Sequence, residues 1–129
     1  MSIPAGLKYT KDHEWTKVDG KRVTVGITAF AVEQLGDITL VNLDVKVGDT
    51  LDAHKAFGTI ESVKTLSDLF APMAGKVVEI NAALTDKPEL VNEDCYGKGW
   101  MVVLEVAGDT GGDLMDEKAY AEHVKASAH

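Results

Sequence analysis

Apolar and polar residues alternate along several short segments of this chain, and such alternation is typical of strands that bury one face. The segments are 22–27, 38–43, 56–60, 75–80 and 100–106. Turn residues separate them, including the Asp-Gly pair at 19–20, the Gly-Asp pair at 48–49 and the proline-containing stretch 71–75. The pattern therefore predicts a mainly β protein built from short strands.

A short helix is predicted at 29–35, where the alternation is interrupted. Thr28 is a suitable N-cap, because its hydroxyl can accept a hydrogen bond from an amide of the first turn. Ile27 and Val32 have the spacing of a hydrophobic staple. Gly36 follows as a stop signal, since glycine accommodates the backbone conformation that ends many helices.

A second helix is predicted near 116–125. Glu117 would lie in its first turn, where a negative charge interacts favourably with the helix dipole. Tyr120 and Val124 have the spacing of an apolar pair on one helix face. Residues 108–113, which contain glycine and aspartate, are expected to form the loop before this helix.

A faint internal repeat relates two parts of the strand-rich region at an offset of 39 residues. The identities that carry it are Asn42 with Asn81, Leu51 with Leu90, and Gly58 with Gly97. So few identities can also arise by chance. A true repeat would indicate two similar β units packed about a pseudo-two-fold axis around one core, as a β-sandwich or flattened barrel.

Length, composition and charge restrict the class of protein. The 129 residues suffice for one domain, 1–129, and a hydrophobic content of 45% with 26% charged residues indicates a globular chain. A formal charge of −8 argues against nucleic-acid binding and suits partners with basic docking surfaces. No apolar stretch approaches the roughly 20 residues that span a bilayer, and residues 1–6 lack the pattern of an export signal. We therefore expect no membrane partner and a location in the bacterial cytoplasm, although a processed mitochondrial chain would look similar.

The motifs of enzymes and metal sites are missing from the sequence. Cys95 is the single cysteine, which excludes an intrachain disulfide, and the four histidines are scattered. The chain contains no nucleophile elbow, Walker loop, dinucleotide glycine fingerprint or zinc-protease motif. Residues 97–100 lack the strand-then-helix context of a phosphate loop and are expected to form a tight turn. The chain is therefore predicted to hold no metal and to catalyse no reaction by itself.

Lys64 has the most distinctive setting of any polar residue. Residues 61–65 lie between the strand-like run 56–60 and a second run that starts at residue 66, so the chain is expected to reverse direction at Lys64. A rigid bend would display the amine in a geometry that an attaching enzyme could recognise. An ordinary solvated charge would also suit this position, and spacing alone leaves both interpretations open.

Several motifs, in order along the chain, resemble those of the glycine cleavage system H protein family. Residues 60–65 and 67–77 resemble the lipoyl-attachment region of that family, and further likeness is found at 8–15, 25–28, 35–38, 88–92, 96–100 and 118–120. The resemblance therefore covers nearly the whole chain. Ala29, Cys95 and Thr65 depart from the family pattern, and none of them is the attachment lysine.

The resemblance implies a hammerhead fold like that of lipoyl domains and a shuttle role without intrinsic catalysis. Lys64 would carry lipoate in amide linkage, as N6-lipoyllysine, and lipoamide is a group carrier. The partners implied are a pyridoxal-phosphate glycine decarboxylase that supplies an aminomethyl group, a tetrahydrofolate-dependent aminomethyltransferase that receives it, and a dihydrolipoamide dehydrogenase that reoxidises the arm. A lipoate-attaching enzyme is a fourth implied partner, and donation of lipoate to other complexes is a second role that the family allows.

The resemblance also assigns roles around the attachment lysine. Glu61 and Ser62 would shape recognition by the attaching enzyme. The residues implied to line a surface cleft for the arm are Glu14, Asp68, Asp12 and Ser67, of which the first two are the leading candidates. A carboxylate there would hold the cationic aminomethyl nitrogen by a charge-assisted hydrogen bond. Acids that are merely solvated would look the same in the sequence.

Two alternatives from the residues themselves are a biotin carrier and an unmodified β interaction domain. The biotinylated lysine usually lies between two methionines, whereas Lys64 lies between Val63 and Thr65, which disfavours biotin. In an unmodified interaction domain Lys64 would be incidental, and its replacement would leave partner binding unchanged.

Overall fold

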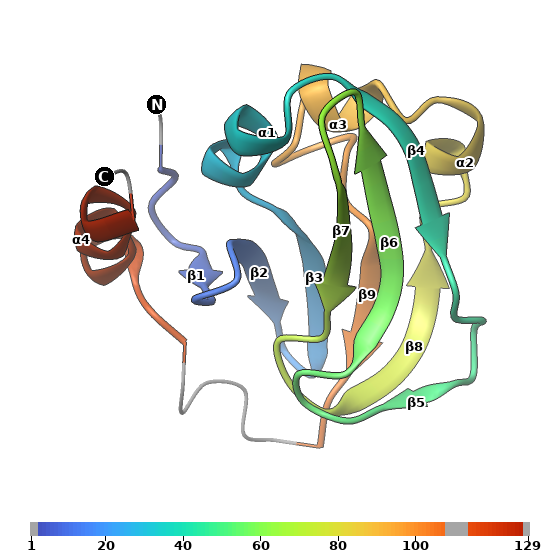
Figure 1. Ribbon diagram of the computed structural model, residues 1–129. Helices are drawn as coiled ribbons and strands as arrows, with labels where there is room; N and C mark the ends of the chain where they lie inside the picture. Colours follow the sequence, from blue (N-terminus) through green and yellow to red (C-terminus); the bar gives the residue numbers. More distant parts are fainter. Residues whose placement is uncertain (1–2, 108–113, 128–129) are drawn as a thin grey trace.

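The computed structural model describes residues 3–107 and 114–127, which form two antiparallel sheets (Figure 1). The larger sheet has the strand order β1 (Lys8–Tyr9), β2 (Glu14–Asp19), β3 (Arg22–Ile27), β9 (Val102–Glu105), β8 (Gly75–Ile80) and β5 (Thr50–Leu51). The smaller sheet has the order β4 (Ile38–Leu43), β6 (Ala56–Ser62) and β7 (Leu66–Phe70). The prediction of a mainly β fold is confirmed, and the two sheets do not close into a barrel.

The main core fills the space between the two sheets. Val25 and Leu104 contribute from the larger sheet and Val41, Ile60 and Leu69 from the smaller one, and all five are buried. A second apolar cluster forms around Tyr9, Trp15 and Tyr120. Burial of such side chains stabilises by about 1.5–3 kcal/mol each, so packing between the sheets fixes the smaller sheet on the larger one.

The predicted helix after the third strand is confirmed as α1 (Ala29–Leu35). The Thr28 hydroxyl accepts a hydrogen bond from the Ala31 amide at 3.3 Å, as an N-cap does. Gly36 ends the helix with a φ of 83°, a conformation that other residues adopt only with strain. The structure thus agrees with both ends expected from the sequence.

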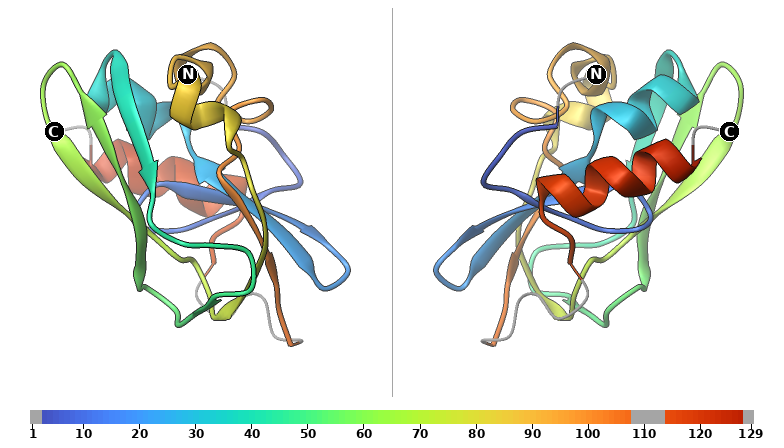
Figure 2. Two further views of the ribbon diagram at one scale, coloured as in Figure 1. Left: turned by 90° about the vertical axis from the view of Figure 1, so that its right-hand side faces the viewer. Right: turned by 90° about the vertical axis from the view of Figure 1, so that its left-hand side faces the viewer.

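The C-terminal helix is also confirmed, as α4 (Glu117–Ser127). It lies on the side of the molecule opposite β4 and β8 (Figures 1 and 2). The loop predicted at 108–113 lies outside the described residues. Across residues 3–107 and 114–127, none of the helices combines the length and apolar character needed to cross a bilayer.

Two helices of four residues each were not expected, α2 (Ala83–Asp86) and α3 (Leu90–Glu93). One turn is too short to show a helical period, and neither helix has a side-chain N-cap. Strand β2 was missed for a different reason: Glu14, Trp15 and Thr16 are all buried, so its first half does not alternate.

The offset of 39 residues relates two strands at one of its three identities, since Asn42 lies in β4 and Asn81 directly follows β8, but at the other two it does not relate equivalent elements. Leu51 lies in β5 whereas Leu90 lies in α3, and Gly58 lies in β6 whereas Gly97 lies in a turn. The glycines serve different backbone needs. A Cβ atom at Gly58 would lie 3.1 Å from the Leu43 Cα atom of the adjacent strand, whereas one at Gly97 would meet the Asp94 carboxylate. The identity of the two glycines therefore arises from unrelated local requirements.

Candidate functional site

Lys64 lies at the exposed tip of the hairpin that joins β6 to β7. The prediction that the chain reverses direction at this residue is confirmed. Ser62 holds the turn in shape: its hydroxyl oxygen accepts hydrogen bonds from the amides of Lys64 at 3.1 Å and Thr65 at 3.2 Å. The Ser62 amide donates to the Thr65 carbonyl at 2.8 Å. The tip is therefore a hydrogen-bonded turn on paired strands, and Ser62, which is buried, has a structural part in it.

The Lys64 side chain lies over the backbone of Gly36, at the end of α1. A Cβ atom at Gly36 would be 3.5 Å from the Lys64 Cε atom and 3.9 Å from Nζ. The hairpin is tied to the same junction, because the Val63 amide donates to the Asp37 carbonyl at 3.1 Å. The absence of a side chain at Gly36 thus leaves room for the lysine stem beside the helix end.

Asn92, in α3, fixes the junction between α1 and β4 beneath Lys64. Its side-chain oxygen accepts from the Ile38 amide at 2.8 Å, and its side-chain nitrogen donates to the Gly36 carbonyl at 3.0 Å. Residues 88–92 were singled out by resemblance but given no role. Their contact with residues 36–38 joins segments far apart in the chain, which residue spacing does not reveal.

Replacement of Asn92 by alanine is expected to destabilise the protein by about 1–2 kcal/mol, since two hydrogen bonds are lost and a backbone amide loses its partner. Equilibrium unfolding in urea measures this change. The matched control is Asn42→Ala, which removes an exposed side-chain contact to Asp44 and should change stability by less than about 0.5 kcal/mol. Equal effects of the two substitutions would contradict the role of Asn92.

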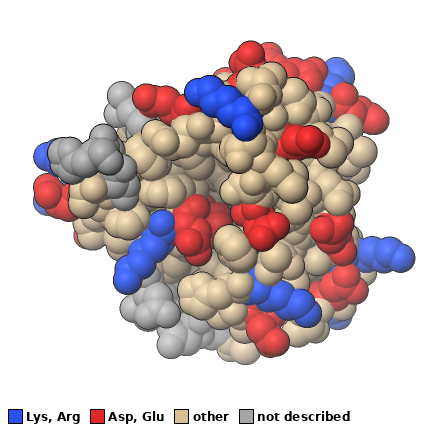
Figure 3. Space-filling model, viewed as in Figure 1, with Lys and Arg blue, Asp and Glu red and all other residues tan. Residues whose placement is uncertain are grey.

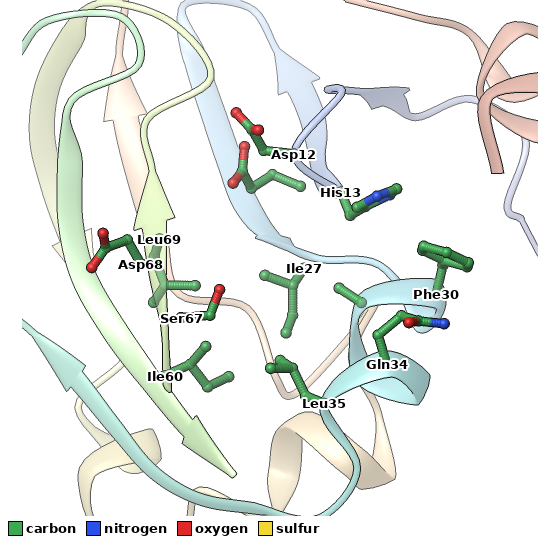
Figure 4. Close-up of a pocket in the computed structure, with 12 residues that line it drawn as sticks. Asp12, His13, Ile27, Phe30, Gln34, Leu35, Ile60, Ser67, Asp68 and Leu69 are labelled. Atoms are coloured by element: carbon green, nitrogen blue, oxygen red, sulfur yellow. The ribbon is translucent and has the colours of Figure 1, made fainter. Parts of the chain in front are cut away.

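A cleft of about 330 Å³ opens between α1, the loop before β2 and the inner side of β6 and β7. Its apolar residues include Ile27, Leu35 and Ile60, which point toward one another in Figure 4. Leu35 is adjacent in sequence to Gly36, over which the Lys64 side chain lies. The hollowed face is visible in Figure 3, with acidic side chains at its rim.

Glu14 is the buried acid of this cleft, with an exposed fraction of 2%. The Thr10 hydroxyl donates to its carboxyl at 2.8 Å. Burial raises the pKa of Glu14 to about 7, and the charge of Asp12 adds to this rise. Hydrogen bonds from Thr10 and from the Phe70 backbone oppose the rise in pKa but do not cancel it. The cleft therefore contains a carboxyl group that titrates near neutral pH.

The other predicted cleft acids occupy different positions. Asp12 lies on the exposed rim near Glu14, and the Ser67 hydroxyl points toward the cleft (Figure 4). Asp68 also borders the cleft, but its carboxylate points away from that of Asp12 (Figure 4). Successive side chains of a strand point to opposite faces, so Ser67 and Asp68 cannot both face inward. The structure thus brings together Glu14, Asp12 and Ser67 and leaves the Asp68 carboxylate outside.

The loop before β2 is held by contacts that the sequence interpretation did not anticipate. Thr10 accepts hydrogen bonds from the amides of Asp12 at 3.2 Å and Glu14 at 3.1 Å. His13 has a φ of 67°, and its Nδ1 atom lies 2.8 Å from the Tyr120 hydroxyl of α4. Burial and the neighbouring His123 lower the pKa of His13, whereas Asp12 raises it. Helix α4 therefore packs directly against one wall of the cleft.

The three positions that depart from the family pattern lie outside the cleft lining. The Ala29 amide donates to the Tyr96 hydroxyl at 3.0 Å, and the carbonyl of buried Cys95 accepts from the Trp15 indole at 2.8 Å. Thr65 is exposed in the turn.

Among residues 3–107 and 114–127, no group of three or more potential ligands could hold a metal ion.

Fold and site together define a small, mainly β protein that presents a lysine on a hairpin beside a partly apolar cleft with a buried acid. Residues 7–127 match the family model described as Glycine cleavage H-protein, and the chain belongs to this family.

Similar proteins come from several bacteria. The glycine cleavage system H protein of Nitratidesulfovibrio vulgaris (strain DP4) is 52% identical over 129 residues, which cover 100% of both chains. The one from Bacteroides thetaiotaomicron is 52% identical over 121 residues, covering 93% of this chain and 95% of that protein. The crystal structure of a glycine cleavage system H protein from Mycobacterium marinum matches with a TM-score of 0.84 at 38% identity, covering 98% of this chain and 100% of the other.

Proposed function

We propose that this chain is the lipoyl carrier of a glycine cleavage system, with lipoate attached in amide linkage to Lys64. The observation that supports this most strongly is the position of Lys64, which is exposed on a hydrogen-bonded turn and lies over Gly36, the neighbour of the cleft residue Leu35. Membership of the glycine cleavage H-protein family supports the same role. A biotin carrier or an unmodified interaction domain has no comparable support.

The cleft suits an arm of lipoyl-lysine length. Such an arm extends ~14 Å from the Cα atom by ordinary covalent dimensions. An extended chain spans at most ~3.3 Å per residue, so Ser67 and Asp68, which border the cleft, lie no more than roughly 10–13 Å from Lys64. This part of the cleft is therefore within reach of an arm that starts at the hairpin tip.

The residues of the cleft fit the two ends of such an arm. Ile27, Leu35 and Ile60 offer an apolar surface to a hydrocarbon chain, and Glu14 offers a carboxyl group to a cationic amine. With a pKa raised to about 7, Glu14 is part-protonated near neutral pH, and an approaching cation would favour its ionised form. The lipoyl group supplies the disulfide chemistry of transfer, while these side chains bind the arm and exclude water.

The proposed partners are a glycine decarboxylase, an aminomethyltransferase and a dihydrolipoamide dehydrogenase, which exchange the aminomethyl group and electrons with the carrier. A tether raises the effective concentration of the carried group at each active site, so the chain functions without an active site of its own. Amide formation would also remove the lysine charge and make the formal charge more negative than −8 by one unit. We further propose that the chain acts as a single carrier domain in the bacterial cytoplasm.

Reconstitution tests this proposal. The purified chain, treated with a lipoate-attaching enzyme, lipoate and ATP, is added to the three partner enzymes with glycine, tetrahydrofolate and NAD. The lipoylated chain should support NADH formation, and the untreated chain should not. A chain treated with a biotin-attaching enzyme and biotin serves as the control. Equal NADH formation with and without lipoylation would contradict the proposal.

A further inference from the structure

Helix α4 brings one buried hydroxyl group to the wall of the cleft. Tyr120, in the first turn of α4, is fully buried, and its ring stacks on that of Tyr9 with 4.6 Å between the centroids. The Tyr120 hydroxyl oxygen lies 2.8 Å from His13 Nδ1 and 2.7 Å from the Thr28 hydroxyl oxygen. One oxygen atom therefore links α4 to both the loop before β2 and the start of α1.

The two segments that meet at this hydroxyl form adjoining walls of the cleft. His13 borders the cleft, and Thr28 is the N-cap of α1, which contributes Phe30 to the lining. The rings of His13 and Phe30 are in contact, with 4.5 Å between their centroids, and lie side by side at one end of the cleft (Figure 4). The Thr28 amide also donates to the His13 carbonyl at 2.9 Å, so the path of the backbone is fixed without Tyr120. What the Tyr120 hydroxyl adds is the orientation of the His13 ring.

The donors and acceptors around the Tyr120 hydroxyl match one another. The Thr28 oxygen accepts from the Ala31 amide and can donate its own proton to the Tyr120 oxygen. The Tyr120 proton can then be donated to Nδ1 of His13, which accepts in the neutral ring. Burial lowers the pKa of His13 and so favours the neutral ring. Burial raises the pKa of Tyr120 to about 12, so its hydroxyl keeps its proton near neutral pH.

Loss of this hydroxyl would leave two polar groups short of a partner. The Thr28 hydroxyl is fully buried and would lose its contact with Tyr120, and the His13 ring would lose the hydrogen bond that sets its rotation. His13 directly precedes Glu14, the buried acid, and both border the cleft. A His13 ring that is free to turn would admit water beside the Glu14 carboxyl group.

We propose that Tyr120 is a positioning residue for the carrier, whose hydroxyl holds His13 and the start of α1 in the arrangement that closes the cleft around the loaded arm. The proposal rests on the carrier function above. Tyr120 itself is not part of the cleft lining, so it acts through His13 and Thr28 and not by contact with the arm. Its loss should therefore shorten the lifetime of the loaded arm and leave attachment of lipoate to Lys64 unchanged.

The first measurement is the spontaneous decay of the loaded arm in Tyr120→Phe. The lipoylated chain is loaded with glycine and a glycine decarboxylase, and the enzyme is then removed. Water cleaves the aminomethyl group from sulfur and gives the thiol, formaldehyde and ammonium, and the release of ammonium is followed. The rate should rise by about fivefold, since one lost buried hydrogen bond changes an opening equilibrium by about that factor.

The matched control is Tyr9→Phe, which removes the other hydroxyl of the stacked pair. Tyr9 is fully buried too, but its hydroxyl donates to the Pro4 carbonyl, and neither residue borders the cleft. The decay rate of this variant should stay within about twofold of the original rate, because its loss of stability is not local to the cleft. Urea unfolding measures the loss of stability in both variants, which separates loosening of the cleft from general destabilisation.

The second measurement needs no lipoate. Hydrogen exchange of the unmodified chain should be about fivefold faster in Tyr120→Phe at the amides of Thr28 and Ala31, which are bonded to the His13 carbonyl and the Thr28 hydroxyl. The same amides should exchange at the original rate in Tyr9→Phe. A second variant, His13→Asn, removes the imidazole from the Tyr120 hydroxyl without changing α4, and asparagine tolerates the positive φ of residue 13. This variant should also shorten the lifetime of the loaded arm.

Equal decay rates in Tyr120→Phe, His13→Asn and the original protein would overturn the positioning role. Equal acceleration by Tyr120→Phe and Tyr9→Phe would do the same, because general destabilisation would then explain both. A lipoylated original chain that cannot be loaded with glycine and the decarboxylase would overturn the carrier function and this proposal with it. Loading of the original chain separates the two claims, since it supports the carrier function whatever the variants do.

Discussion

Replacement of Lys64 by arginine is expected to abolish NADH formation in the reconstituted glycine cleavage system while leaving the fold intact. Arginine keeps the positive charge and most of the length of the side chain. Its guanidinium group, however, stays protonated and offers no free amine for acylation. Because the arm would be the sole route by which the carried group reaches the partner enzymes, its loss removes the activity completely and not in part.

The control for this substitution is Lys98→Arg, since Lys98 is exposed in the turn after α3 and far along the chain from the hairpin. That variant should support NADH formation at the rate of the original protein. Unfolding in urea should give the same midpoint for both variants, because both side chains are exposed. Residual activity of Lys64→Arg above that of a mixture without this chain would contradict the proposed attachment.

Replacement of Glu14 by glutamine is expected to stabilise the protein at alkaline pH and to change its stability little at pH 4.5. The pKa of Glu14 is raised from 4.5 to about 7 in the folded protein, so the folded state binds a proton that the unfolded state releases. The stability contributed by this proton is fully present below pH 4.5 and is lost as the pH rises through 7. The total loss is about 3 kcal/mol, from about 1.4 kcal/mol per pKa unit.

Urea unfolding of both proteins between pH 4.5 and pH 8.5 measures this effect. The free energy of unfolding of Glu14→Gln minus that of the original protein should rise with pH by about 3 kcal/mol, mostly between pH 4.5 and pH 7.5. The comparison cancels the pH dependence of the other groups. The control is Glu33→Gln on α1, which makes the same chemical change at an exposed position outside the cleft lining. A difference for Glu14→Gln that stays flat with pH would contradict a protonated acid in the cleft.

Much of the fold follows from local sequence. Helix α1 was predicted at both ends because Thr28 and Gly36 act through their immediate neighbours. The strands around Lys64 were predicted because one face of each packs on the core, as Ile60 and Leu69 do. The elements that were missed depend on tertiary contacts: the start of β2 is buried on both faces, and α2 and α3 are single turns.

The site was predictable only in part. The position of Lys64 at a turn follows from the flanking strands. Its contact with Gly36, however, joins two segments that lie far apart in the chain. Glu14 and Asp68 looked equivalent as acids near the arm, yet strand alternation turns the Asp68 carboxylate outward while Glu14 is buried. The role of Asn92 depends on its hydrogen bond to the carbonyl of Gly36, which is 56 residues away in the chain. No local sequence pattern indicates such a contact.

The most direct test of the carrier account is the intact mass of this protein after expression in cells supplied with lipoate. The account predicts a mass about 188 Da above that of the polypeptide, as amide formation with lipoate requires. Peptide mapping should place the addition on Lys64, and Lys64→Arg should lack it. A folded sample without the added mass, or with the addition on another residue, would contradict the account.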